Sequence, residues 1–482
     1  MMTKTSFTPL DPRSWRAHVA YRLSETAGLA RLRTPVDVAF EIPDAVKDGK
    51  LPELRVALEV NGAWAEVPAQ FYGLASAATD PSSRATSRDS GTSLSGRAAF
   101  FMDFGANETK EVRLYYGDPP AGVTGLGRDL PVRGLKVVKG PLGPLHYSLE
   151  GEHFRIETMP KSGQIWHIWN KLGSDSSWHH HEWDSNKDKG GDPCHWAPNC
   201  WVAYPERVTN GYDAPDPDSF DWHYVFGWDH PDTEIIDGPV FWELRRRGVV
   251  WPHPEHSNPN LRRDKSELIA AEVVYRFYHG CPWFYQSSTI RTLRDLLVYF
   301  IRNSQFVFLD HLFTHAIICP EAVGVKPTDA VEPAVVPLMA RLNVKPFEGV
   351  QHSLSNVLPS KLDYTGFYSS ETGDGFAQFQ LLERNSNQFT GKPTYYNHMT
   401  FLTELPQWAV YFCRAFSYTN LRFHPENAVF LPKGEQYEEE NVCLIYRHEK
   451  LADTLGRLER MKRELQNPVK IEEIHVTPGR VP

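Results

Sequence analysis

The sequence predicts an all-β protein in which an N-terminal β-sandwich is followed by a larger β-sandwich and one C-terminal helix. Short segments rich in β-branched and aromatic residues, separated by turn residues, recur along most of the chain. Residues 117–134 carry Gly and Pro throughout, which indicates a domain boundary. Residues 449–467 form the one clear helical pattern. We therefore expect two domains, residues 1–135 and residues 136–482.

The first domain is predicted from four segments with alternating or β-branched patterns. These segments are residues 36–43, 54–60, 96–104 and 110–117. Their spacing is typical of a sandwich of antiparallel strands. Residues 76–96 are rich in Ser and poor in large apolar residues, so we expect a long flexible loop there.

The second domain begins near residue 138 and repeats the same strand pattern. Its predicted strands lie within residues 141–171, 238–250, 267–291, 304–318, 376–384, 408–418 and 440–448. Residues 293–303 fit either a strand or a helix. In the helix, the apolar residues at helical spacing lie on one face with charges opposite, so we expect it to brace the sandwich. These residues are Leu451, Leu455, Leu458 and Met461.

Composition excludes some classes of function. The net charge is −9 over 482 residues and no basic stripe is present, so a nucleic-acid partner is not expected. No apolar run reaches the roughly 18 residues of a membrane span, and the N-terminus lacks the apolar run of a secretory signal. The six cysteines form no CxxC pair, which favours reduced thiols in a cytoplasmic protein. The sequence leaves open whether the chain forms a homo-oligomer.

Three stretches resemble the β-supersandwich of the galactose-mutarotase-like superfamily. They are the turn KSGQI within residues 141–171, DGPVFWELRRRG (237–248) and AVFLPKGEQYEEENVCLIYR (428–447). The N-terminal segments PVDVAFEIP, NGAWAEVPAQF and VRLYYG are similar to the accessory sandwich of exo-rhamnogalacturonan lyases. The resemblance implies a carbohydrate-active enzyme, since that module occurs in sugar mutarotases, glycosidases and polysaccharide lyases.

The run HHHEWD, residues 179–184, is a candidate metal site. In a strand, His180, Glu182 and Asp184 would share one face. Imidazole with carboxylate suits Zn or Mn, whereas Ca would need more oxygen ligands. The alternative is a solvated loop or sheet edge, and whether a divalent metal is required stays open.

The run DPCHWAPNCW, residues 192–201, is the stronger candidate for a saccharide site. Trp196 and Trp201 could stack on a sugar ring, Asn199 could bond to hydroxyls or a carboxylate, and His195 could transfer a proton. Aromatic residues make up 12% of the chain, including 14 Trp, which is common in β-proteins that hold sugars. The alternative is a packed loop whose indoles close one end of the sandwich.

Further candidates lie downstream. Tyr224, His253 and His256 occur in aromatic or Pro-bracketed runs, and Arg263 could bind a carboxylate in a forked geometry. His315 lies four residues after another histidine, so the two share a face in either a strand or a helix. Each of these residues also fits an ordinary loop or core position.

These side chains favour β-elimination on an acidic oligosaccharide, with a uronate as substrate. His195 or His256 would act as the base and Tyr224 as the acid. Asn199 and Arg263 would hold the carboxylate. Two alternatives remain: a glycoside hydrolase, which needs two opposed carboxylates, and a non-catalytic carbohydrate-binding protein.

Overall fold

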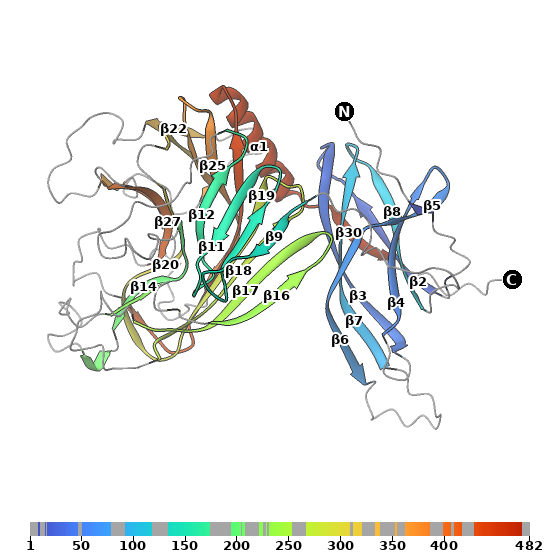
Figure 1. Ribbon diagram of the computed structural model, residues 1–482, viewed down its shortest axis with the longest axis horizontal. Helices are drawn as coiled ribbons and strands as arrows, with labels where there is room; N and C mark the ends of the chain where they lie inside the picture. Colours follow the sequence, from blue (N-terminus) through green and yellow to red (C-terminus); the bar gives the residue numbers. More distant parts are fainter. Residues whose placement is uncertain are drawn as a thin grey trace. The chain divides into compact units, whose positions relative to one another are not determined.

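A computed structural model gives the fold of the chain (Figure 1). It describes residues 8–9, 15, 17–46, 51–78, 92–117, 134–173, 194–203, 205–207, 221–224, 228, 231–252, 267–308, 312–320, 333–337, 352–353, 362–385, 399–405, 409–416 and 429–474. The predicted all-β class is confirmed: strands dominate these residues, and one α-helix, α1 (Leu451–Gln466), lies near the C-terminal end. None of the helices within these ranges is long and apolar enough to cross a membrane.

The chain divides into two compact units. The first unit comprises residues 1–133, 236–242 and 463–482, and the second comprises residues 134–235 and 243–462. The sequence had predicted a single break at residue 135 and gave no sign that the two later segments group with the N-terminal residues.

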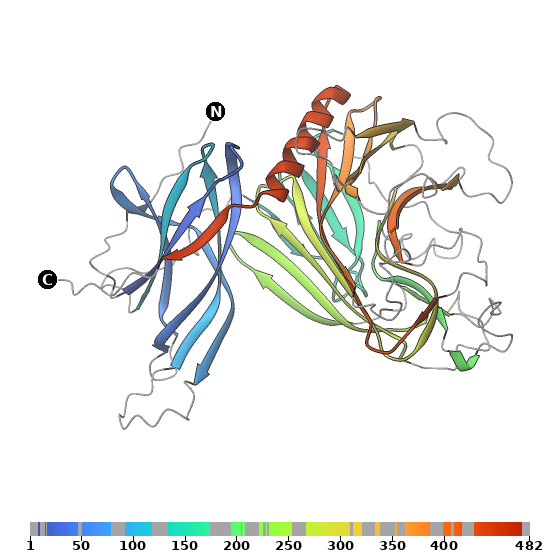
Figure 2. The same ribbon diagram turned by 180° about the vertical axis from the view of Figure 1, so that it is seen from behind.

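The first unit contains two sheets (Figure 2). The six-stranded sheet has the order β1 (Thr8–Pro9), β5 (Ala63–Val67), β4 (Glu53–Val60), β8 (Thr109–Gly117), β2 (Ala17–Ser24) and β30 (Lys470–Ile474). The three-stranded sheet has the order β3 (Arg31–Val46), β7 (Thr92–Phe104) and β6 (Ala69–Ala78). In β3 the alternation predicted from the sequence holds, because Val36, Val38 and Phe40 are buried in the shared core while the residues between them are not.

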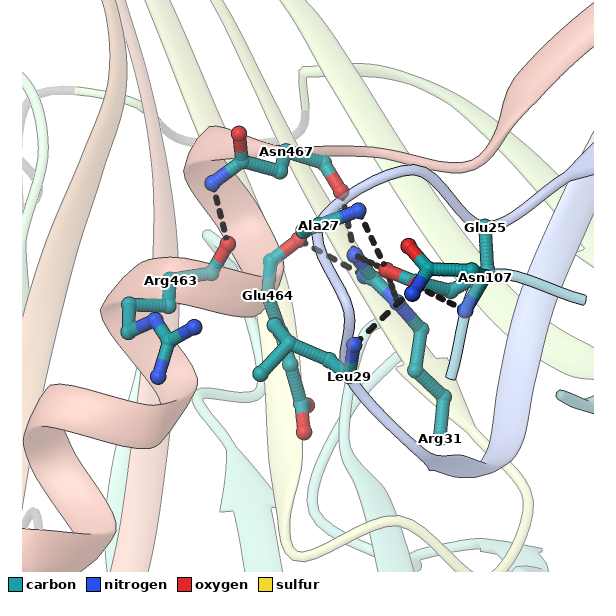
Figure 3. Close-up of polar contacts among 8 residues, drawn as sticks. All are labelled: Glu25, Ala27, Leu29, Arg31, Asn107, Arg463, Glu464 and Asn467. Carbon is teal, nitrogen blue, oxygen red and sulfur yellow. Dashed lines mark hydrogen bonds and ion pairs between the residues drawn. The ribbon is translucent and has the colours of Figure 1, made fainter. Parts of the chain in front are cut away.

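A buried ion pair fastens the end of α1 within the first unit (Figure 3). The carboxylate of Glu25 accepts hydrogen bonds from the backbone N–H groups of Ala27, Leu29 and Asn107, each at 3.0 Å. It also pairs with Arg31 at 3.0 Å.

The guanidinium of Arg31 reaches the last turn of the helix. It donates to the backbone oxygens of Glu464 at 2.9 Å and Asn467 at 2.5 Å. Carbonyls at a helix C-terminus lack partners within the helix and carry partial negative charge, so a cation stabilises them. Burial alone would raise the pKa of Glu25, but the three backbone donors and Arg31 hold that pKa at about 2.

The second unit is built around two large sheets. The nine-stranded sheet has the order β16 (Asp232–Asp237), β17 (Phe241–Val250), β18 (Ile269–Tyr278), β19 (Trp283–Thr292), β29 (Gln436–Arg447), β25 (Asp374–Asn385), β24 (Leu362–Tyr368), β21 (His315–Pro320) and β22 (Ala334–Pro337). The eight-stranded sheet has the order β15 (Asp221–Tyr224), β14 (Asn199–Ala203), β20 (Leu296–Phe308), β27 (Ala409–Phe416), β26 (Met399–Leu405) and β23 (His352–Ser353), with β13 (His195–Trp196) and β28 (Val429–Leu431) also paired to β20. The segment 293–303, which fitted either pattern, thus lies largely in a strand.

The two large sheets share an aromatic core. Phe306 and Phe308 of β20 lie 4.8 and 5.0 Å, between ring centroids, from Phe376 of β25. A smaller sheet of β12 (Ile165–Asn170), β11 (Phe154–Thr158), β10 (Tyr147–Glu150) and β9 (Lys136–Lys139) completes the described strands of this unit. The faces of β20 and β25 that meet at this core are therefore interior faces, and they position the polar residues described next.

Candidate functional site

Polar side chains form a band across the interior face of the nine-stranded sheet. The register places Tyr275 of β18 opposite Gln286 of β19, and Gln286 opposite Asn441 of β29. Residues directly opposite each other project on the same face, so these three form one row. Ser288 and Glu439 form the adjacent row. Together with their buried neighbours on β17 and β25 they make up the interior polar band: Arg246, Tyr275, Gln286, Ser288, Gln378, Glu439 and Asn441.

Every member of the interior polar band is at most 1% exposed. Burying a polar group costs free energy unless it is hydrogen-bonded, so a sandwich core usually avoids such groups. The seven buried polar residues of this band lie next to a core of phenylalanines. Packing of an apolar core does not require them, so the band is a candidate site.

His195 of β13 joins this band to the opposite sheet. Its Nδ1 lies 2.5 Å from the hydroxyl of Tyr275, and its Nε2 lies 3.1 Å from the hydroxyl of Ser304 on β20. The amide of Gln378 donates to Ser304 at 2.8 Å, and Tyr275 donates to Gln164 at 2.5 Å. The imidazole therefore bridges the two sheets through hydrogen bonds at both nitrogens.

The direction of these hydrogen bonds fixes the tautomer. Because Tyr275 gives its one proton to Gln164, its oxygen accepts from Nδ1–H of His195. Nε2 then accepts from Ser304. The chain of donors ends where the amide of Gln164 donates to the backbone oxygen of Ala197. The result is an ordered relay through a neutral imidazole.

Burial determines the protonation of this relay. It holds the pKa of His195 well below its ordinary value, and the positive charge of Arg246 acts in the same direction. Burial raises the pKa of Tyr275 to about 12. At neutral pH both groups are therefore uncharged.

A buried carboxylate lies at one end of the band. Glu439 accepts a hydrogen bond from the amide of Asn441 at 3.0 Å, and the same amide donates to Gln286 at 3.0 Å. The backbone register of β25 against β29 places residue 383 opposite Glu439. Sequence patterns alone did not reveal this register, because the two strands come from separate segments.

The structure divides the predicted DPCHWAPNCW site between two faces of one sheet. His195 is opposite Phe306 of β20 and faces the interior. Trp196 is opposite Gln305, which accepts a hydrogen bond from Asn199 at 2.6 Å. Within β13, His195 and Trp196 project to opposite faces. The bond from Asn199 to Gln305, the residue opposite Trp196, places Asn199 on the side of Trp196. His195 and Asn199 are fully buried, whereas the two indoles are half-buried.

The other predicted residues lie apart from this cluster or beyond the described ranges. Tyr224 of β15 is opposite Asn199 in register. His315 of β21 bonds to the hydroxyl of Thr314 at 2.7 Å and is opposite Tyr368 of β24. Several predicted residues lie outside the described residues: His180, Glu182, Asp184, His253, His256 and Arg263. In the part of the chain that is described, no group of three or more His, Cys, Asp or Glu could hold a metal ion.

The sequence did contain a signal for one residue of the band. In WELRRRG, Arg245 and Arg247 flank Arg246 on a strand, so alternation sends the middle arginine to the opposite face from its neighbours. Tyr275 and Ser304 gave no comparable signal. Each lies in a strand that holds other polar residues, and only the register of distant strands brings it to His195.

Comparisons with known proteins give a fold but no family. No family model and no curated protein matches the chain. The structure is similar to a protein of glycosyl hydrolase family 38 from Enterococcus faecalis, with a TM-score of 0.50, 9% identity, and coverage of 96% of this chain and 48% of that one. The chain thus spans about half the length of that protein.

Two further solved structures were found. An alpha-mannosidase from Enterococcus faecalis aligns with 95% of this chain and 46% of its own, at 11% identity and a TM-score of 0.49. A galactose mutarotase-like protein from Lactobacillus casei aligns with 65% of this chain and 100% of its own, at 11% identity and a TM-score of 0.34.

Proposed function

We propose that the chain is a carbohydrate-active protein that binds a saccharide at the interior polar band, and that its chemistry is glycoside hydrolysis. The proposal rests on two buried polar atoms of the band that lack hydrogen-bond partners among the described residues. Within the described residues, Nε2 of Gln286 has no acceptor and Oδ1 of Asn441 has no donor. A sugar hydroxyl can accept from the first and donate to the second. Because these atoms are buried, a saccharide reaches them only when the interior opens.

A buried carboxylate favours hydrolysis over elimination. Glycoside hydrolases use two carboxyl groups, one as the acid and one as the nucleophile or base. Glu439, which is 1% exposed on β29, would supply one of these groups. The fold likeness to a family 38 protein supports the same choice. Elimination with His195 as base is less supported, because Nε2 already accepts from Ser304 and Nδ1–H is held by Tyr275.

The test is turnover of a panel of neutral and acidic aryl glycosides and oligosaccharides by the full chain. Released sugar with no ultraviolet absorbance from an unsaturated product would identify hydrolysis, whereas that absorbance would identify the lyase. We expect Glu439→Gln to lower kcat by about 10²–10⁴-fold, the usual contribution of a general acid–base group. The matched control is Glu440→Gln, which lies next along β29 and faces the other side of the sheet. Equal activity of the two variants would remove Glu439 from the mechanism.

One observation favours a second function, that of a non-catalytic carbohydrate-binding part of a larger enzyme. The chain spans about half of the family 38 protein, so an activity of that protein need not lie in the shared half. In this case the chain would bind oligosaccharides without turnover. Replacing Glu439 by Gln would then change the dissociation constant and no rate.

A further inference from the structure

Arg246 carries hydrogen-bond donors that nothing in the described part of the chain satisfies. Its Nη1 donates to the backbone oxygen of Ser162 at 2.9 Å. Among the described residues, Nε and Nη2 have no acceptor in hydrogen-bonding geometry, although Arg246 is fully buried and its guanidinium interacts with the hydroxyl of Tyr275. Within the same residues the indole Nε1 of Trp228, which is 1% exposed, also has no acceptor. The guanidinium carbon lies 5.4 Å from the centre of that indole.

The surroundings hold the arginine in place without neutralising it. The ring of Tyr275 lies 4.6 Å from the guanidinium carbon, so two aromatic rings contact the cation and partly offset its desolvation. Gly163 allows this position, because a Cβ there would lie 2.9 Å from Cδ of Arg246. The positive φ of 68° at Gly163 also favours glycine. The turn KSGQI therefore holds Arg246 in two ways. The backbone oxygen of Ser162 accepts its hydrogen bond, and Gly163, which has no side chain, leaves room for it.

The free edge of Arg246 has the geometry of an anion-binding group. Nε and Nη2 are adjacent donors on one side of the planar guanidinium, and such an edge matches the two oxygens of a carboxylate or sulfate. A neutral hydroxyl could accept one hydrogen bond but would leave the charge uncompensated. A buried, unpaired cation is strongly unfavourable, so the structure keeps this arginine at a cost to stability.

We propose that the Nε–Nη2 edge of Arg246, together with Nε1 of Trp228, binds the anionic group of an acidic saccharide. The inference rests on the proposed function and narrows its substrate class to sugars that carry a carboxylate or sulfate. Arg246 and Glu439 lie on the same interior face, on β17 and β29 of one sheet. The anionic group would fix the orientation of the sugar relative to the carboxylate of Glu439.

The experiment is calorimetric binding of galacturonate oligosaccharides, sulfated galactose oligosaccharides and neutral galactose oligosaccharides to the full chain. We expect at least one acidic ligand to bind about tenfold or more tightly than its neutral counterpart, as a charge-assisted bidentate contact would give. Arg246→Met should abolish this preference. Arg247→Met, which removes the same charge from the exposed face of β17, should retain it. Arg246→Lys keeps the charge without the two-nitrogen edge and should lose most of the preference.

Stability separates a binding role from a structural one. If Arg246 serves a ligand, Arg246→Met should unfold at the same urea concentration as the wild type or at a higher one, because an unpaired buried charge is gone. A large loss of stability in Arg246→Met, or a preference that survives in Arg246→Lys and Arg246→Met, would overturn the inference. Equal binding of acidic and neutral ligands would overturn the inference alone. Absence of binding to every saccharide would overturn the proposed function, even if inorganic sulfate bound.

Discussion

Replacing Glu25 by Gln should destabilise the first unit by about 3 kcal/mol at neutral pH. The substitution removes the charge that pairs with Arg31, which is 3% exposed, and weakens the acceptor for three backbone N–H groups. Breaking a buried ion pair by removing one partner costs about 3–5 kcal/mol. Glutamine retains one acceptor oxygen, so we expect the lower end of that range. Arg31 keeps its bonds to the backbone oxygens of Glu464 and Asn467.

The pH dependence gives an independent check. The pKa of Glu25 is about 2 in the folded chain, below the value of about 4.3 for an unfolded glutamate. A lowered pKa means that the ionised carboxylate stabilises the fold, fully above about pH 4.3 and progressively less as the pH falls toward 2. The difference in stability between wild type and Glu25→Gln should therefore shrink between pH 5 and pH 2, about the range over which a paired carboxylate loses its contribution.

The measurement is urea unfolding, which leaves ion pairs unscreened, combined with hydrogen exchange of the amides in β2 and β30. These strands pair in the first unit, from Ala20 opposite Ile474 to Ser24 opposite Lys470, so their exchange reports on that unit. Glu472→Gln is the control, because it removes an exposed carboxylate from β30 and should change little. A loss below about 1 kcal/mol, or a loss that is the same at both ends of the pH range, would refute the reasoning.

Three other substitutions test the packing of the second unit. Tyr275→Phe leaves Nδ1–H of His195 without an acceptor and should lower the free energy of unfolding by about 1–3 kcal/mol, measured by urea unfolding. Gly375→Ala would place a Cβ 2.0 Å from a ring carbon of Tyr446, and we expect a loss of about 1–3 kcal/mol or more from overpacking. Gly456→Ala should have the opposite effect, because a Cβ at this position in α1 would have no heavy atom within 4 Å. Alanine favours a helix over glycine by about 0.5–1 kcal/mol, so we expect the melting temperature to rise. Destabilisation by the last substitution would contradict the open space around that residue.

The strands could be predicted from the local sequence because the alternation of apolar and polar residues is contained within each strand. In residues 36–43, alternation of apolar and polar residues reports one buried face, and the structure places Val36, Val38 and Phe40 in the core. The helix at 449–467 is confirmed as α1 for the same reason, with Leu458 and Met461 buried. The periodicity of a strand or a helix can be recognised from its own residues, without knowledge of the strands or helices that it packs against.

Pairing between distant strands left no such record. β30 completes the six-stranded sheet by pairing with β2. Its sequence, KIEEI, does not indicate that it pairs with a strand more than 440 residues away. The hydrogen-bond partners of His195 also left no signal in the sequence, because Tyr275 lies 80 residues later and Ser304 lies 109 residues later. A hydrogen-bonded relay is a property of register, and register is set by the whole sheet.

The division of the DPCHWAPNCW run bears directly on mechanism. A single loop could have offered imidazole, amide and indoles to one sugar, but β13 sends His195 to the interior and Trp196 to the other face. Proton transfer by His195 and stacking on Trp196 therefore do not serve the same saccharide. The rings of Tyr275 and Trp228 both contact Arg246. Because Tyr275, Glu439 and Arg246 share the interior of the second unit, the proposed acidic substrate is inferred from the arginine and not from the tryptophan-rich run.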